Sequence, residues 1–462
     1  MTIMRKQIAC VLALAFIFLG LAVPSFSETA DIFSRVQEHK LDNGLTVLLL
    51  PERRAPIITV QIWYRVGSRN EVLGKTGLSH LAEHLMFRGT EKYGPKVFSR
   101  LIQQAGGNNN AFTSKDYTAY FATGPKTNLK LFLELEADRM RHLKIDEELF
   151  QTERKVVIEE RRLRTDDDPV HSLYEETVAT AFKAHPYQWP IIGWMHDIEN
   201  LTLQDMRTFY DTYYQPNNAT LVVVGDIDPS AALNEIKATF GAIPKGPDPP
   251  PFLPLEPPQQ GERRTELNRE AQLPAIFMGY HTPNLEQADA YALEVLSLIL
   301  SQGRSSRLHR RLVYEKKLAL DAGAEYEFAT ASPSLFVFYA QPLPKNPIST
   351  VEAAMNAEIE SLKTKPVSEK ELAKAKNQTE SSFIMNQDSL FYRGMLLGRY
   401  QTTGSWRKLN EIVPAIRAVT AEDVQRVAKK YLVKANCTTG ILYPIKPSRP
   451  TMERFQPHEQ IR

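Results

Sequence analysis

The sequence predicts a chain of two similar halves, each built from helices and strands and joined by a proline-rich segment. The joining segment, residues 244–261, holds so many prolines that it excludes a helix or a central strand. One pattern recurs on either side of it at a constant offset of 218 residues, as Thr202…Asp205…Tyr213…Asn218 and Thr420…Asp423…Tyr431…Asn436. Each copy has a Thr-x-x-Asp helix start, one helix and an apolar strand. We therefore expect residues 28–243 and 262–462 to share a fold.

Alternating or continuous apolar runs predict the strands of both halves, and capped or amphipathic runs predict the helices. In the first half we expect strands at Leu45–Leu50, Ile57–Val66, Ala111–Thr123 and Ala219–Gly225, and helices around 77–86, at Pro95–Gln104, within 126–182, at Thr202–Tyr214 and before Phe240. In the second half we expect strands at Ala275–Tyr280, Leu320–Phe328, Leu335–Gln341 and Asn436–Tyr443, and helices at Glu286–Leu300, Ser305–Lys316 and after an N-cap at Ser368.

The composition describes an ordinary soluble globular protein. The 462 residues are 43% hydrophobic and 24% charged, which suits two or three domains with sizeable cores. The formal net charge of +2 and the lack of a Lys/Arg run give no sign of a nucleic-acid surface.

The N-terminus has the pattern of a secretory signal. Arg5 and Lys6 precede an apolar run, and Ser25 and Ser27 are small residues of the kind a signal peptidase recognises. We expect residues 1–27 to be a signal peptide. The alternative, an uncleaved anchor, is disfavoured because the run is short and ends at Pro24.

Cleavage would leave Cys437 as the sole cysteine, which excludes an internal disulfide. Cys437 lies in an expected strand, where a small buried hydrophobic side chain is the ordinary interpretation. Secretion without disulfides favours a bacterial periplasm.

One stretch, Gly77-Leu-Ser-His80-Leu-Ala-Glu83-His84-Leu-Met, places chemistry on one face of a helix. Its apolar residues share an arc, and His80, Glu83 and His84 fall together on roughly the opposite side. Two histidines at i and i+4 can ligate one zinc ion, and the carboxylate can act on a water bound to it. This is the H-x-x-E-H order. A surface helix that carries two histidines by chance is the alternative.

A third ligand is expected from the next helical region. Glu153 and Glu160 are two turns apart on one face, so either could complete a His–His–Glu site while the other orients a histidine. Glu159 is a competitor that points about 100° away from Glu160. A salt-bridged solvent face with the neighbouring arginines is the structural alternative. The second half has no equivalent histidine pair with a carboxylate, so only the first half could bind the metal.

Several collinear motifs resemble the pitrilysin–insulysin family of zinc metallopeptidases, in its small-subunit branch with mitochondrial processing peptidase. They are Asp42-Asn-Gly-Leu-Thr-Val, the histidine motif with Phe-Arg-Gly-Thr90 after it, Asn110-Ala-Phe-Thr-Ser, Glu153-Arg…Glu160, His185-Pro-Tyr, Gly193-Trp and Tyr214-Gln-Pro-Asn-Asn. The resemblance covers nearly everything after the signal. It implies an α+β fold of two similar halves, each a mainly antiparallel sheet packed with helices, that close like a clamshell around an unfolded peptide.

The resemblance also implies the roles of the site residues. His80, His84 and Glu160 would be the zinc ligands, which decides between Glu159 and Glu160; Glu83 would be the general base and Glu153 would support a ligand. The strand that begins at Asn110, Ala111 and Phe112 would pair with the substrate backbone.

The sequence departs from self-sufficient relatives in its second half. Those relatives carry an Arg and, seven residues on, a Tyr that reach the substrate carbonyl, whereas the aligned positions here are Val313 and Leu320. Arg310, Arg311 and Tyr314 are near but out of register. Loss of such a donor costs about a hundredfold in rate. We therefore expect a heterodimer whose partner, a subunit of the same fold, supplies Arg and Tyr. The expected function is zinc-dependent endopeptidase activity; the alternative is a non-catalytic structural or peptide-binding subunit.

Overall fold

The computed structural model describes residues 32–445. Residues 32–36 hold a short 3₁₀ helix, Ile32–Arg35, and belong to a unit separate from the one that starts at Gln37. The expected signal peptide, residues 1–27, lies outside the described residues. Within the described range, we find no helix with both the length and the apolar character needed to cross a membrane.

The first half contains a mainly antiparallel sheet in the order β1-β2-β6-β3-β5-β4. Its strands are β1 (Gln37–Lys40), β2 (Thr46–Pro51), β3 (Ile57–Tyr64), β4 (Asn108–Thr113), β5 (Thr118–Pro125) and β6 (Ala219–Gly225). Only the β2–β6 pair is parallel. The central strands β2, β3 and β6 are almost fully buried; β2 and β6 are mainly Leu and Val, and β3 adds aromatic and polar residues to Ile and Val. Strand β4 pairs only with β5 among the described residues, so its other edge is open.

In the described residues, the second half repeats this sheet but has no counterpart of the edge strand β1. Its strands are β7 (Arg263–Glu270), β8 (Ala275–Thr282), β9 (Ala319–Tyr326), β10 (Ser334–Pro342) and β11 (Cys437–Ile445), in the order β7-β11-β8-β10-β9. Again only one pair, β7–β11, is parallel. The protein therefore has the expected α+β fold of two similar halves.

The duplicated segment repeats down to single hydrogen bonds. Thr202 and Thr420 each form a capping box at the start of a helix. The Asn218 side chain donates to the carbonyl of Tyr213 at 2.9 Å, and Asn436 donates to the carbonyl of Tyr431 at the same distance. The segment of residues 244–261 between the halves contains no helix or strand.

The α-helices pack on the two sheets and on one another. They are α2 (Leu78–Leu85), α3 (Val97–Gln104), α4 (Leu129–His142), α5 (Glu147–Arg161), α6 (Pro169–Ala181), α7 (Met195–Asn200), α8 (Leu203–Tyr213), α9 (Pro229–Thr239), α10 (Asp289–Ser301), α11 (Ile348–Thr364), α12 (Glu369–Asn386), α13 (Leu390–Thr403), α14 (Leu409–Ala418) and α15 (Ala421–Tyr431). Two segments are π-helical, Arg162–Asp166 and His309–Glu315. A large hydrophobic core lies in the first half, where α2, α4 and α8 pack on the sheet.

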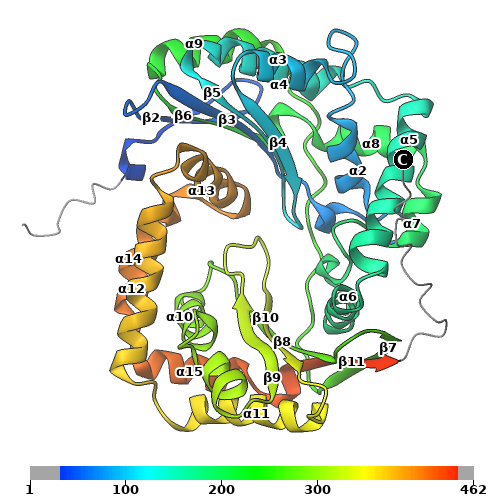
Figure 1. The fold of residues 1–462 in the computed structure, drawn as a ribbon. Coiled ribbons are helices and arrows are strands. Elements are labelled where there is room, and N and C mark those ends of the chain that lie inside the picture. The colour runs from blue at the N-terminus through cyan, green and yellow to red at the C-terminus, as the bar shows by residue number, and fades with distance from the viewer. Residues whose placement is uncertain (1–31, 446–462) are drawn as a thin grey trace, which may run out of the picture. The chain divides into compact units, whose positions relative to one another are not determined.

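Each half contributes one helix to the sheet of the other half (Figure 1). Helix α6 packs on β7, β8 and β11, while α13 packs on β3 and β6. Glycines permit the second contact: a Cβ at Gly398 would lie 2.1 Å from the Trp63 ring, and one at Gly394 would lie 2.4 Å from the Gln61 amide. The Gln61 amide also donates to the carbonyl of Phe391 at 2.9 Å.

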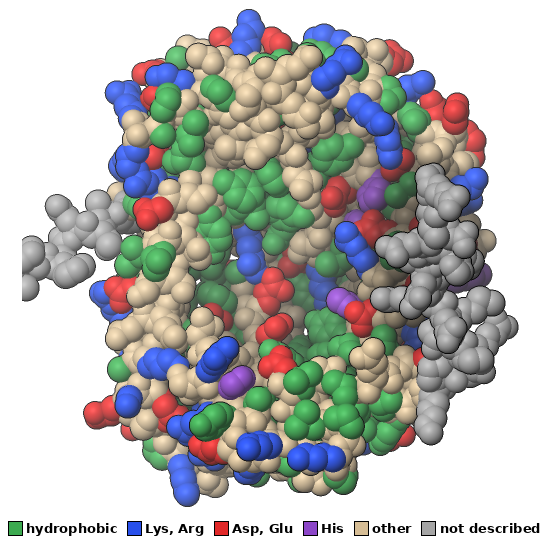
Figure 2. All heavy atoms as spheres, viewed as in Figure 1, with side chains coloured by type: hydrophobic (Ala, Val, Ile, Leu, Met, Phe, Trp, Pro, Cys, Tyr) green, Lys and Arg blue, Asp and Glu red, His purple; other side chains and the backbone are tan. Residues whose placement is uncertain are grey.

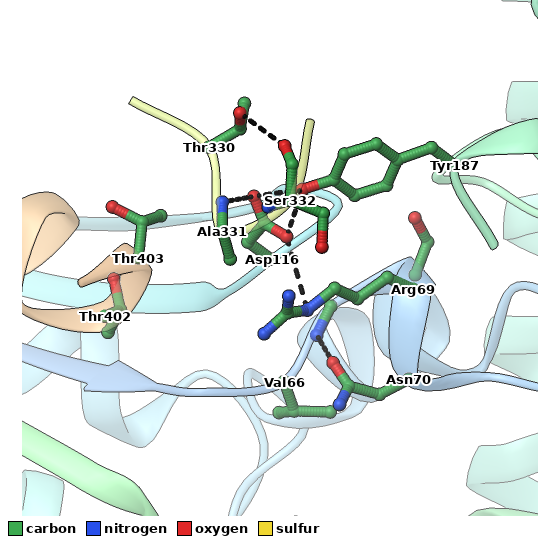
Figure 3. Close-up of polar contacts among 12 residues, drawn as sticks. Val66, Arg69, Asn70, Asp116, Tyr187, Thr330, Ala331, Ser332, Thr402 and Thr403 are labelled. Carbon is green, nitrogen blue, oxygen red and sulfur yellow. Dashed lines mark hydrogen bonds and ion pairs between the residues drawn. The ribbon is translucent and has the colours of Figure 1, made fainter. Parts of the chain in front are cut away.

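A buried carboxylate, Asp116, also links the halves (Figure 3). It accepts hydrogen bonds from the Tyr187 hydroxyl at 2.7 and 2.8 Å and from the Ala331 backbone N–H at 3.0 Å. The Arg69 guanidinium lies 3.2 Å from the same carboxylate. Asp116 therefore joins the β4–β5 turn to the loop between β9 and β10.

Two expectations for the strands were wrong. The expected single strand Ala111–Thr123 is instead the hairpin of β4 and β5, which turns at Lys115-Asp116. The second half begins with β7 rather than at Ala275; β7 alternates exposed and half-buried residues with only one apolar side chain, Leu267, so it carries no strand signal. Cys437 is buried at the start of β11, as expected for a small hydrophobic residue.

Candidate metal centre

Helix α2 presents His80, Glu83 and His84 from one side and packs with the other. Its side chains Leu78, Leu81, Ala82 and Leu85 are buried in the first-half core. The helix begins after Gly77, whose φ of 94° is left-handed. A Cβ there would lie 2.6 Å from the Ile192 carbonyl oxygen, so this close approach requires glycine.

Helix α5 brings a carboxylate to the two histidines. Glu160 Oε2 lies 3.2 Å from His84 Nε2, and Glu160 Oε1 lies 3.8 Å from His80 Nε2. One ligand-type atom from each of the three residues lies within 4.8 Å of the others. The three side chains that the sequence nominates as metal ligands are therefore together, 13% to 21% exposed.

Glu153 and Glu159, the other two α5 carboxylates that the sequence offers as candidates, lie in different surroundings. Glu153 is buried, with Oε2 at 3.3 Å from His84 Nδ1 and Oε1 at 2.6 Å from Arg88 Nε. Glu159 is 63% exposed and pairs with Arg162. The salt-bridged solvent face considered from the sequence therefore describes Glu159 and not Glu153.

The electrostatics of the two histidines differ. Burial, with His84 and Arg164 nearby, lowers the pKa of His80 to about 3. Burial also opposes protonation of His84, but the hydrogen bond with Glu153 and the charge of Glu160 outweigh it and raise its pKa. For Glu153, burial tends to raise the pKa, but the interactions with His84 and Arg88 outweigh burial and hold the pKa below its usual value.

Glu83 faces a cavity of about 1090 Å³ that it shares with the three ligand-type residues. Burial raises the pKa of Glu83, against a hydrogen bond from Thr113 that lowers it. Thr113 is the last residue of β4, so the open edge strand ends at the carboxylate of Glu83. In the space-filling view, histidine and acidic side chains lie close together beside the hollow of this face (Figure 2).

The nominated substrate-binding residues lie on β4 and line the same cavity. The Ala111 N–H bonds to the side-chain oxygen of Asn110 at 2.9 Å and so takes no part in the β4–β5 ladder. Phe112 packs edge-on against Trp63, with ring centroids 5.5 Å apart. The Ala111 N–H is thus available to a second strand, whereas the Phe112 ring is partly occupied by the core.

Among the described residues, the second half contributes none to the lining of this cavity. Val313 lies in the π-helical segment, and Leu320 is a 55% exposed residue of β9. Arg311 is paired with Glu358 at 2.7 Å. Arg310 pairs with Glu315 and Tyr314 is 76% exposed.

Sequence reasoning assigned no role to several residues that contact the site. Thr113 donates a hydrogen bond to Glu83, Arg88 forms an ion pair with Glu153, and Arg164 Nη1 lies 2.6 Å from Glu160 Oε1. Arg88 and Arg164 each follow a ligand-type residue by four positions, which is a helical spacing that could have nominated them. Thr113 lies in the quoted Asn110-Ala-Phe-Thr-Ser stretch, but no spacing rule links it to α2.

The family model described as Insulinase (Peptidase family M16) matches residues 46–193, and the model described as Peptidase M16 inactive domain matches residues 200–379. The zinc protease PqqE of Helicobacter pylori is 36% identical over 410 residues, which cover 87% of this chain and 92% of that protein. A zinc protease of Rickettsia felis is 26% identical, over 88% of this chain and 97% of that one.

Solved structures give the same result. The crystal structure of a protease from Helicobacter pylori has a TM-score of 0.86 at 35% identity and covers 88% of this chain and 99% of that chain. The periplasmic protease PqqL from Escherichia coli shares the fold, with a TM-score of 0.73 at 19% identity over 93% of this chain and 52% of that chain. With its two family matches and its extended identity to a zinc protease, this chain belongs to the insulinase family of peptidases.

Proposed function

We propose that the chain is a zinc-dependent endopeptidase that hydrolyses unfolded peptides or small protein segments. One observation carries this proposal: His80, His84 and Glu160 converge in one cavity with Glu83, and the open edge of β4 ends at the same place. The names of the relatives, which are zinc proteases, agree with it.

The donor set fits zinc. Two imidazole nitrogens and one carboxylate oxygen are a common catalytic zinc set, which leaves a fourth position open. Zinc bonds of about 2 Å place tetrahedral ligand atoms about 3.3 Å apart, and the distances from Glu160 to His84 and His80 are 3.2 and 3.8 Å. A ligand histidine must be neutral, which the low pKa of His80 favours. Glu153 on His84 Nδ1 supplies the outer hydrogen bond that ligand histidines usually make.

The chain's own residues then have distinct tasks. Bound zinc would polarise the scissile carbonyl and lower the pKa of the attacking water. Glu83 takes the proton from that water and passes it to the leaving amine. Thr113 holds the Glu83 carboxylate toward the cavity. Glu153 fixes the orientation of the His84 ring.

The edge of β4 supplies affinity for a peptide without much demand on sequence. An extended substrate would add a strand beside β4, and its carbonyl would replace the Asn110 side chain on the Ala111 N–H. Backbone hydrogen bonds are the same for every residue type, so this mode suits unfolded segments of varied sequence.

We further propose that full activity needs a homologous partner that supplies Arg and Tyr. Val313 and Leu320 have no side-chain donor, and no second-half residue between 262 and 445 lines the cavity. Export to a bacterial periplasm, with removal of residues 1–27, belongs to the same proposal. It is supported by the apolar run after Arg5 and Lys6 and by the single remaining cysteine.

The test measures zinc content and peptide hydrolysis on the purified chain, alone and with a candidate partner. Stoichiometric zinc is expected, with hydrolysis that rises strongly when the partner is added. Glu83→Gln should retain zinc and lose hydrolysis; retained hydrolysis would refute the role of Glu83. Full hydrolysis without a partner would refute the heterodimer. A chain that contains no zinc would support the alternative of a non-catalytic peptide-binding subunit.

A further inference from the structure

We propose that Glu71 is a positioning residue of the metal centre: it holds the first turn of α2 and, through that turn, His80. Its Oε2 accepts the backbone N–H of Gly77 at 2.8 Å, and its Oε1 accepts that of Ser79 at 2.7 Å. The side chain is 5% exposed, so water cannot take its place. The inference deepens the proposed zinc site and rests on it.

Helix α2 needs such support because of its length and its start. It has eight residues, and isolated helices of that length are not stable in water. The first N–H groups of a helix lack partners inside it, and a Ser, Thr or Asp at the N-cap usually satisfies one of them. Here the N-cap is Gly77, which offers no side chain, so Glu71 satisfies the amides from a distance in sequence.

The two histidines of α2 are held in different ways. Glu153 contacts His84 Nδ1 and fixes that ring directly. His80 Nδ1 is buried and has no hydrogen-bond partner among the described residues. The position of His80 therefore depends on its backbone, and the amide that Glu71 accepts belongs to the residue just before it.

The segment that carries Glu71 is itself fixed. Asp197 Oδ2 accepts the N–H of Gly74 at 3.1 Å and the Thr76 hydroxyl at 2.7 Å. The Thr76 hydroxyl in turn accepts the N–H of Trp194, just before α7. Because this segment is fixed, Glu71 can hold the first turn of α2 in a defined position. A loosely held carboxylate could not.

Small displacements matter at a metal site, because ligand distances must hold within about 0.2 Å. Mutation of groups that orient ligands lowers metal affinity about 10- to 100-fold. Glu71→Gln keeps the shape of the side chain but turns one acceptor into an NH₂ group that faces an N–H. We expect zinc affinity to fall about tenfold or more, measured by competition with a chelator on the full chain.

Asp423→Asn is the matched control. Asp423 accepts the N–H of Thr420 in the capping box of α15, in the half without the metal. The Asp423→Asn variant should have a lower melting temperature but an unchanged zinc affinity. It therefore separates a general loss of helix capping from a loss of ligand position. If Glu71→Gln does not fold by circular dichroism, Glu71→Asp, which shortens the reach by one carbon, is judged by the same criterion.

The outcomes are distinct. Weaker zinc binding in the Glu71 variant but not in Asp423→Asn supports the inference. Equal zinc affinity in the unchanged chain and the folded Glu71 variant overturns it and leaves the zinc site intact. No zinc binding by the unchanged chain overturns the proposed function and this inference together.

Discussion

Glu153 Oε2 lies 3.3 Å from Nδ1 of His84, while the other ring nitrogen of His84 lies 3.2 Å from Glu160. The ring is thus held between a buried carboxylate and a ligand-type carboxylate. Because the Glu153 carboxylate lies beside Nδ1–H, it orients the imidazole ring and makes Nε2 a more basic metal ligand.

The first prediction concerns this pair. Glu153→Gln should lower zinc affinity about 10- to 100-fold, because a neutral amide neither fixes the tautomer nor raises the basicity of His84. It also leaves Arg88 without its ion pair. Chelator competition measures the effect. Unchanged affinity would show that Glu153 serves Arg88 alone.

The second prediction separates two adjacent carboxylates. Glu160→Gln should abolish tight zinc binding, since it removes one of the three proposed ligands. Glu159→Gln, at an exposed side chain that pairs with Arg162, should leave zinc content and activity unchanged. Metal analysis of the two purified variants decides, and a zinc loss in the Glu159 variant would contradict the assignment.

How far the sequence predicts the site depends on spacing within helices. His80, Glu83 and His84 share a turn, and Glu153 and Glu160 are two turns apart, so helical periodicity alone brings each set to one face. Periodicity could not say which carboxylate meets which histidine, because that depends on how α5 packs on α2. Glu71 left no signal at all, since its role comes from a loop that folds back onto the helix start.

The fold was predictable where local rules are strong. The capping boxes at Thr202 and Thr420, with the constant offset, revealed the duplication. The β4–β5 hairpin was missed although Ser114 and Asp116 are of types common in turns, because no Gly, Asn or Pro interrupts the run of Thr and aromatic residues around them. Contacts of Asp116 with Tyr187 and Ala331 hold that turn, and tertiary contacts leave no local signal.

The third prediction tests the edge strand. Ala111→Pro removes the N–H that is directed away from the β5 ladder, and proline is tolerated on an edge strand. The loss of one hydrogen bond of about 1 kcal/mol should lower kcat/KM for peptides about fivefold. Zinc affinity should stay the same, because Ala111 is not a ligand. An unchanged kcat/KM would exclude strand addition at Ala111.

The fourth prediction concerns the link between the halves (Figure 3). Asp116 is 2% exposed and contacts Arg69, Tyr187 and the Ala331 N–H. Asp116→Asn leaves a buried guanidinium without its counter-charge, so unfolding free energy should fall by about 3–5 kcal/mol. Amide hydrogen exchange should rise most at residues 329–333.

Its control is Asp388→Asn. Asp388 is 82% exposed and lies 3.6 Å from Arg54, so its loss should change stability by less than about 0.5 kcal/mol. Urea unfolding of both variants gives the comparison. Equal stability of the two would show that Asp116 does not join the halves energetically.

The fifth prediction is a pH dependence of stability at the start of α12. Glu371 accepts two hydrogen bonds from Arg307, at 2.6 and 2.9 Å, and closes the capping box with Ser368. The Arg307 bonds, against partial burial, lower the pKa of Glu371 to about 2. Because the folded-state pKa lies below the usual value of 4.5, the stabilisation is complete above that value and is lost as the pH falls toward 2.

Glu371→Gln should therefore cost about 1–2 kcal/mol at pH 7, and the gap to the unchanged chain should close between about pH 5 and pH 2. Glu369→Gln removes the same charge from the same helical turn but no ion pair with Arg307, so it should show a smaller loss. Urea unfolding from pH 7 to the lowest pH at which both chains still fold measures the gap. A gap that stays constant with pH would show that the Arg307–Glu371 pair adds nothing to stability, because only the ionised carboxylate can lose its contribution in acid.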